Sequence, residues 1–194
     1  PTGATPAAKT DAPTGKVNAY NCGASLARHM IEGTIVCDDG VTSGGLVRAA
    51  TAGAAKHDWL SLTGGAIGMG LPLAIGAAVA APDRKVISLN GDGAGMYTNQ
   101  ALWTMAREKL DVLSIVFANR SYRILNVEMT RTGAGNPGPT AQSMLSLDNP
   151  AVDWVKLAEA QGVPAVRCET SEDFEAQLSR LIATKGPALI EAIL

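Results

Sequence analysis

A single carboxylate between two glycines is the feature of this sequence best suited to chemistry. Gly91-Asp92-Gly93 follows the largely apolar run 86–89 after a single residue, Asn90. Glycine turns after strands commonly hold phosphates, because their backbone N–H groups can approach the anion closely. A bare carboxylate would repel that anion unless a divalent cation lies between the two. The turn therefore predicts a metal-assisted phosphate site, with Asp92 at an exposed strand end.

A second candidate ligand follows the next apolar run. Asn119 comes directly after residues 112–118 and lies 27 positions after Asp92. A strand–helix–strand unit takes about 30 residues, so this spacing returns the chain to the same edge of a parallel sheet. A carboxylate, an amide oxygen, a loop carbonyl, waters and phosphate oxygens would together complete a magnesium shell.

The same residues also have other interpretations. Gly-Asp-Gly is more often an ordinary turn, and an Asn after a strand is often a cap. A nicotinamide-dinucleotide site fits less well, because Gly91, Gly93 and Gly95 lack the final glycine spacing of that fingerprint. Asp92 would also occupy the place of the pyrophosphate.

The elements needed to position these residues alternate along the chain. We expect strands at 34–38, 59–62, 85–89, 112–118, 163–167 and 188–193, and helices at 21–32, 43–50, 67–81, 99–108, 122–129, 153–161 and 171–184. Continuously apolar strands between helices indicate a three-layer, doubly wound α/β/α fold with a mostly parallel sheet of about six strands.

Three local expectations accompany this fold. Asn21 is expected to cap the first helix, on which His29 faces solvent. The helix 67–81 consists of small residues and is expected to be buried on all sides. Residues 130–150 contain five Gly or Pro residues within 133–139, so a lid without regular structure is expected there.

Composition narrows the class of protein. The net charge of −2 gives no electrostatic case for nucleic acid. The uncharged run 59–82 contains Pro72 and several glycines, so it does not resemble a membrane span. The three cysteines are odd in number and widely spaced, which favours small core residues, a reducing compartment and a cytoplasmic location.

The domain boundaries are expected near the start of the chain. Residues 1–17 have the composition of a flexible linker or tail, and 18–194 form the folded domain. The first residue is Pro1 rather than Met, so a C-terminal piece of a larger enzyme is expected.

The motif around Asp92 resembles that of a known superfamily. Gly91-Asp92-Gly93, its spacing to Asn119 and the following Ser121-Tyr122 resemble the thiamine-diphosphate-binding motif of the acetolactate synthase and benzoylformate decarboxylase superfamily. The resemblance extends from about residue 34 to residue 194. Ala118 departs from it, because the family usually has a second Asn at this position.

The resemblance implies a role for each matching residue. Asp92, Asn119 and the carbonyl of Ser121 would be the Mg²⁺ ligands. The remaining cofactor-binding residues would be Gly65, Ile67, Gly91, Gly93, Ala94, Tyr122 and Leu125. Among them, Gly65 would accept a hydrogen bond from the aminopyrimidine, and Ile67 would be the apolar wedge beneath the bent cofactor.

The resemblance also implies an activity that this chain does not complete. Thiamine diphosphate and Mg²⁺ would serve an acetolactate-synthase-like enzyme that decarboxylates a small 2-oxo acid and transfers the acyl unit. The alternatives are a simple decarboxylase of the benzoylformate decarboxylase type, which Trp103 and the tail 185–191 also resemble, and a non-catalytic module.

The catalytic group is expected on another domain. The family's activating glutamate belongs to an N-terminal pyrimidine-binding domain of the same or a neighbouring subunit, and no glutamate here lies in a matching motif. We therefore expect no catalytic residue in this chain, and a homodimer or homotetramer for the parent enzyme.

Overall fold

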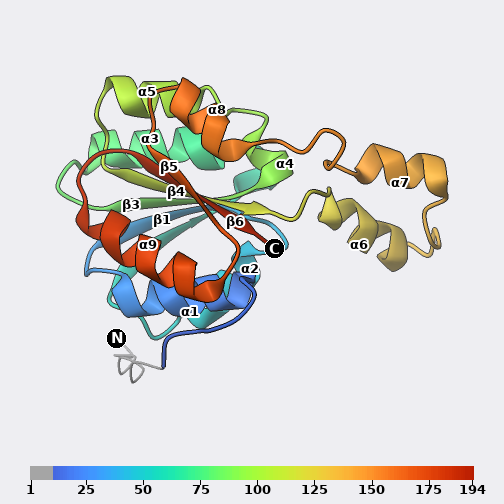
Figure 1. Ribbon diagram of the computed structural model, residues 1–194, viewed down its shortest axis with the longest axis horizontal. Coiled ribbons are helices and arrows are strands. Elements are labelled where there is room, and N and C mark those ends of the chain that lie inside the picture. Colours follow the sequence, from blue (N-terminus) through green and yellow to red (C-terminus); the bar gives the residue numbers. More distant parts are fainter. Residues whose placement is uncertain (1–10) are drawn as a thin grey trace.

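Six parallel strands form one twisted sheet at the centre of the molecule (Figure 1). The computed structural model describes residues 11–194. The strands are β1 (Thr34–Asp39), β2 (His57–Ser61), β3 (Val86–Gly91), β4 (Val112–Ala118), β5 (Ala165–Cys168) and β6 (Ala188–Ile193). Their order is β2-β1-β3-β4-β6-β5, and every neighbouring pair is parallel. The predicted three-layer α/β fold is confirmed.

Helices cover both faces of the sheet (Figure 1). One face carries α1 (Ala19–His29), α2 (Gly44–Ala50) and α9 (Ser171–Ala183), and the other carries α3 (Gly70–Ala80), α5 (Ala101–Arg107) and α8 (Trp154–Ala160). The shorter or peripheral elements are η1 (Thr63–Gly65), α4 (Asp92–Gly95), α6 (Arg123–Arg131) and α7 (Pro139–Leu145).

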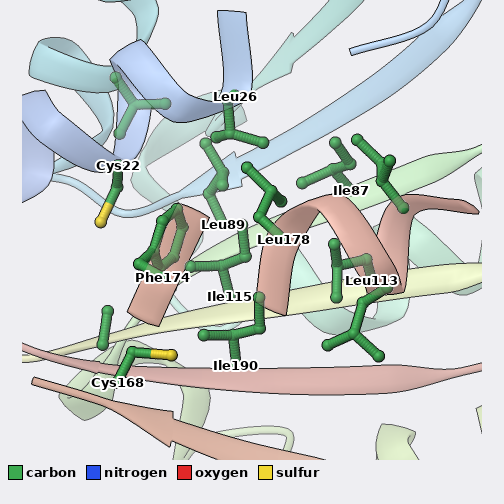
Figure 2. Packing of buried hydrophobic residues seen from close by; sticks show 14 of the residues in the cluster. Cys22, Leu26, Ile87, Leu89, Leu113, Ile115, Cys168, Phe174, Leu178 and Ile190 are labelled. Carbon is green, nitrogen blue, oxygen red and sulfur yellow. The ribbon is translucent and has the colours of Figure 1, made fainter. Parts of the chain in front are cut away.

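The apolar strands supply side chains to a core on each side of the sheet. Ile87 and Ile115 belong to the core beneath α1 and α9, where Figure 2 shows them with Phe174 of α9. Val86 and Val116 belong to the opposite core, among side chains of α3, α5 and α8. Each large aliphatic side chain buried in this way stabilises the fold by about 1.5–3 kcal/mol.

The order of the strands creates the place for a site. From β1 the chain moves to β2 at one edge of the sheet, whereas β3 lies on the other side of β1 and leads towards β4. Helices on the two sides therefore diverge at the carboxyl ends of β1 and β3. Ligands of doubly wound sheets bind in the crevice at such a switch point.

Helix α3 differs from its prediction in start and in burial. It begins at Gly70 rather than at residue 67, because Gly68 has a φ of +89°, which interrupts a right-handed helix. One side of α3 is exposed, and Val79 retains 65% of its accessible surface. The prediction of a helix buried on all sides was therefore wrong.

The first helix is capped by an earlier residue than predicted. The side chain of Asn18 accepts a hydrogen bond from the backbone N–H of Asn21 at 2.9 Å, so Asn18 is the N-cap. His29 does not simply face solvent, because its Nε2 lies 2.7 Å from Oε1 of Glu175 on α9.

The segment predicted as an irregular lid contains helices. Helix α6 continues to Arg131, and α7 follows with Pro139 in its first turn, where proline is well tolerated. Neither helix contains a buried residue, and both project from the body of the domain (Figure 1). We call residues 123–145 the arm.

The described chain makes contacts with the domain before residue 18. Residues 1–10 of the predicted linker lie outside the described residues, but Lys16 forms a β-bridge with Thr170 and Val17 is buried. All three cysteines are buried and free, as predicted. Among residues 11–194, no helix is long and apolar enough to cross a membrane.

Candidate functional site

A narrow cleft lies at the switch point, where three strands end. Its lining comes from residues 40–43 after β1, residues 91–94 after β3, and residues 119 and 121–124 after β4, together with Ile67. Its volume is about 40 Å³. That is room for about three water molecules, so the cleft accepts a small ion or the end of a larger ligand.

Asp92 connects the ends of β3 and β4. Its Oδ2 accepts a hydrogen bond from the backbone N–H of Arg120 at 2.6 Å, and its Oδ1 accepts one from Gly93 at 2.9 Å. The residue is only 5% exposed, so the predicted exposed position was wrong. The Asp92 carboxylate is buried because it accepts hydrogen bonds from N–H groups of the loop after β3 and the loop after β4.

Burial also changes the acidity of Asp92. Desolvation raises the pKa of its carboxyl group above the ordinary value, and the hydrogen bonds from Arg120 and Gly93 oppose that shift only in part. The negative charge of Glu191 raises the pKa further. A divalent cation would favour the ionised form and would therefore relieve this unfavourable burial.

Asn119 is held by a local turn. Its Oδ1 accepts a hydrogen bond from the backbone N–H of Ser121 at 2.9 Å, and Arg120 between them has a φ of +55°. This left-handed residue reverses the chain directly after β4. As a result, Asn119 and Ser121 line the same cleft as Asp92.

Tyr122 lies against the glycine motif. A Cβ atom added to Gly93 would be 2.6 Å from Cε1 of Tyr122, so the ring occupies the space that a side chain would need. The backbone N–H of Tyr122 donates to the carbonyl of Leu145, and that of Leu147 donates to the carbonyl of Arg120. Both ends of the arm are thus tied to the loop that carries Asn119.

The structure brings most of the predicted site residues together. The cleft is lined by Ile67, Gly91, Asp92, Gly93, Ala94, Asn119, Ser121 and Tyr122. Gly65 and Leu125 are outside this lining. Gly65 belongs to η1, and Leu125 lies on α6 with 47% of its surface exposed.

The loop after β1 also contributes to the cleft, although the sequence did not predict it. Residues 40–43 line the cleft, and Oδ1 of Asp38 holds the loop by accepting from the N–H of Gly40 at 2.9 Å. Gly44 has no room for a side chain, because an added Cβ would collide with that same oxygen. The glycines at 40, 44 and 45 after a strand were the available signal.

The donor set of the cleft favours a hard cation. Within residues 11–194, no group of three His, Cys, Asp or Glu side chains could hold a metal. The residues that line the cleft instead include one carboxylate, that of Asp92, and one side-chain amide, that of Asn119, and oxygen ligands of these types suit Mg²⁺ when an anion supplies further oxygens. No glutamate lines the described cleft, and His57 lies outside it with Nδ1 bound to the carbonyl of Ala55.

The fold and cleft define a doubly wound α/β domain with a cleft that contains Asp92 and Asn119 at its switch point. Comparison with known families identifies this class more closely: the model for the C-terminal TPP-binding domain of thiamine pyrophosphate enzymes matches residues 43–192. The chain belongs to this family.

The chain is also similar in sequence to individual known proteins. The chain is 47% identical over 188 residues to IlvX of Mycobacterium tuberculosis, which carries the name of an acetolactate synthase large subunit. It is 37% identical over 128 residues to benzoylformate decarboxylase of Pseudomonas aeruginosa. These matches cover 96% and 66% of this chain, but 36% and 23% of those proteins.

A solved structure supports the fold assignment. The thiamine diphosphate-dependent 4-hydroxybenzoylformate decarboxylase of Rhodococcus jostii RHA1 superposes with a TM-score of 0.79 at 28% identity. The match covers 92% of this chain and 32% of that protein. The chain thus spans between 23% and 36% of the length of these three relatives.

Proposed function

We propose that this chain binds the diphosphate end of thiamine diphosphate through Mg²⁺. Asp92, Asn119 and the carbonyl of Ser121 would be the protein ligands of the metal. The observation that carries this proposal is that Asp92 and Asn119, far apart in sequence, line one cleft at the ends of neighbouring strands. The family match supports thiamine pyrophosphate as the ligand.

The other predicted residues are proposed to contact the same ligand. Gly91, Gly93 and Ala94 would let the diphosphate approach the backbone of the turn, where they line the cleft. Ile67 also lines the cleft and would support the aminopyrimidine half, with the carbonyl of Gly65 accepting from it. Leu125 would contact the cofactor only beyond the cleft.

The site is proposed to be one half of a complete active site. The cleft is too small for the whole cofactor, so the remainder would extend beyond it. No glutamate lines the described cleft, and the group that activates the cofactor would come from an N-terminal pyrimidine-binding domain. We propose that this domain belongs to the same or a neighbouring subunit of a cytoplasmic homodimer or homotetramer.

We propose an acetolactate-synthase-like reaction on a small 2-oxo acid. When bound, thiamine diphosphate accepts the electron pair released as carbon dioxide leaves. The acyl unit would then be transferred to a second carbonyl compound. The match to IlvX over 96% of the chain favours this reaction, whereas the Rhodococcus structure favours simple decarboxylation. A non-catalytic module is less well supported because Asp92 and Asn119 are both present.

The proposal is tested by titrating the intact protein with thiamine diphosphate in Mg²⁺ and in EDTA. Tight binding is expected only in Mg²⁺, whereas thiamine, which lacks the diphosphate, should bind weakly in both. Product analysis with pyruvate and the complete enzyme then separates the reactions, because acyl transfer gives acetolactate and simple decarboxylation gives acetaldehyde. Equal binding of thiamine diphosphate in EDTA would contradict the metal-assisted site.

A further inference from the structure

The peptide groups around Gly68 are held by side chains of two different elements. The backbone N–H groups of Gly68 and Gly70 donate to Oδ2 of Asp39, at 2.7 and 3.2 Å. The carbonyl of Gly68 accepts from the hydroxyl of Thr98 at 2.5 Å. Asp39 ends β1, whereas Thr98 follows the α4 segment that begins with Asp92.

The turn that they hold has little support of its own. Gly68 has a φ of +89°, and a Cβ added to it would lie 2.5 Å from Cβ of Tyr97. Met69, the N-cap of α3, makes no side-chain cap bond. Asp39 therefore supplies, from another element, the acceptor that the first N–H groups of the helix need.

The buried carboxylate of Asp39 would destabilise the fold at this position unless its hydrogen bonds to the turn compensate for that cost. Its side chain is fully buried, and burial raises the pKa of its carboxyl group while the N–H groups of Gly70 and Gly68 oppose the shift. Among the described residues, its Oδ1 has no hydrogen-bond partner, and neither has Oδ1 of Asn90. An isolated buried carboxylate costs more than an apolar residue of similar size.

We propose that Asp39 and Thr98 are positioning residues that fix the turn bearing Gly65 and Ile67 relative to the Asp92 motif. This inference rests on the proposed function, in which Ile67 supports the aminopyrimidine half of the cofactor. The two residues do not line the cleft. Their loss should therefore affect recognition of the aminopyrimidine more than recognition of the diphosphate.

The test compares two ligands on the intact protein, Mg²⁺-thiamine diphosphate and Mg²⁺-inorganic diphosphate. Thr98→Val and Asp39→Ala should each weaken the binding of thiamine diphosphate by about tenfold, because the first removes the partly buried hydrogen bond to the carbonyl of Gly68 and the second removes the two buried bonds from the N–H groups of Gly68 and Gly70. Binding of inorganic diphosphate should change by less than about twofold, since its contacts are separate. Thr98→Ser and Asp39→Asn keep the donor or acceptor and should restore most of the affinity.

Two results would overturn the positioning role. One is unchanged binding of thiamine diphosphate in Thr98→Val, which does not depend on whether Asp39→Ala folds. The other is equal loss of both ligands in the variants, which would indicate general disruption.

Amide hydrogen exchange separates this inference from the proposed function. Exchange at Gly68 and Gly70 should rise about tenfold in Asp39→Ala without any ligand, because their acceptor is lost. Unchanged exchange would overturn the positioning role of Asp39. A wild-type protein that binds neither ligand would instead overturn the proposed function, while the exchange result would still decide whether Asp39 holds the turn.

Discussion

Gly93 and Tyr122 show how closely the residues of the cleft depend on one another. The ring of Tyr122 lies where a side chain at position 93 would project, with Cε1 and Cδ1 at 2.6 and 2.8 Å from an added Cβ. Tyr122 in turn donates its backbone N–H to Leu145. Glycine at 93 therefore allows the loop after β4 to close onto the loop after β3.

Gly93→Ala should displace the Tyr122 ring and lower the free energy of unfolding by about 1–3 kcal/mol, as expected for overpacking. Gly91→Ala is the matched control, because an added Cβ there meets nothing within 4 Å. Chemical denaturation of both variants gives the comparison. Equal stability of the two would show that the Tyr122 contact does not require glycine.

The sequence identified some residues of the site and missed others. Asp92 and Asn119 were predicted because their types, spacing and strand ends carry the signal. Asp39 and Thr98 were not, because they bind backbone groups of a turn whose shape depends on the folded structure. The burial of Asp92 was missed for the same reason, since its partner is the N–H of Arg120.

At the scale of elements, charged groups join α1 to α9. Glu175 on α9 accepts from Nε of Arg28 at 2.9 Å and lies 2.7 Å from Nε2 of His29. Burial alone would raise the pKa of Glu175, but its interactions with Ser25, Arg28 and His29 together outweigh burial and hold the pKa below the ordinary value. A lowered pKa means that the ionised carboxylate stabilises the fold above the unfolded pKa, and that this stability is lost as the pH falls through the folded pKa.

Glu175→Gln should therefore lower the free energy of unfolding by about 1 kcal/mol near neutral pH, after allowance for solvent screening. The difference from wild type should shrink steadily as the pH falls through the lowered pKa of the wild-type carboxylate, because that group then becomes protonated. Glu159→Gln, at an exposed position of α8, is the control for losing a carboxylate as such. A difference in the free energy of unfolding that grows as the pH falls would contradict the predicted pH dependence.

The arm is the element most separate from the core. It has no buried residue in α6 or α7, yet its C-terminal end is bound to the loop after β4 by the hydrogen bonds Tyr122–Leu145 and Arg120–Leu147, and its N-terminal end continues directly from that loop. Ligands bound at Asn119 and Ser121 would therefore order the base of the arm. Because α6 and α7 bury no residues, we expect the arm to unfold locally at a low cost in free energy.

Proteolysis and hydrogen exchange at residues 132–138 should be fast in the free protein and slower with Mg²⁺ and thiamine diphosphate, because the ligands would hold the base of the arm. Strand β4, buried along its whole length, is the internal reference. Protection that is the same with and without ligands would show that the arm does not respond to the cleft.

The bounds of strands were predicted correctly where a continuous apolar run determines them. The buried runs 112–118 and 188–193 became β4 and β6 with the predicted bounds. Helix α7 was missed because the Gly and Pro residues before it dominate the local pattern. The arm is also closed by a bridge between Ser121 and Ser146, a long-range contact that the local sequence does not reveal.

At the scale of the whole molecule, we propose that the cleft is one part of a larger active site. It contains candidate metal and phosphate ligands, but no described residue that lines it is a glutamate. The chain also spans about a third of the length of IlvX and of the Rhodococcus enzyme. Under the proposed function, the cofactor would be bound in this cleft, and the group that activates it would come from another domain.

The chain of residues 1–194 alone should turn over neither pyruvate nor benzoylformate with Mg²⁺ and thiamine diphosphate present, because general acid–base catalysis is missing. Activity should appear when a longer protein supplies the glutamate-bearing domain. Steady turnover by the 194 residues alone would contradict the half-site proposal. The assay needs folded protein, which near-ultraviolet circular dichroism verifies.

The most direct measurement is the affinity of Asp92→Asn for thiamine diphosphate in saturating Mg²⁺, by calorimetric titration of the intact protein. Asparagine has the same shape as aspartate and keeps one acceptor oxygen for one of the two N–H groups, those of Arg120 and Gly93, so the fold should remain while the charged metal ligand is lost. The affinity should fall by about a hundredfold, whereas Asp83→Asn in an exposed turn should bind as wild type. Wild-type, Mg²⁺-dependent affinity in Asp92→Asn would contradict the account.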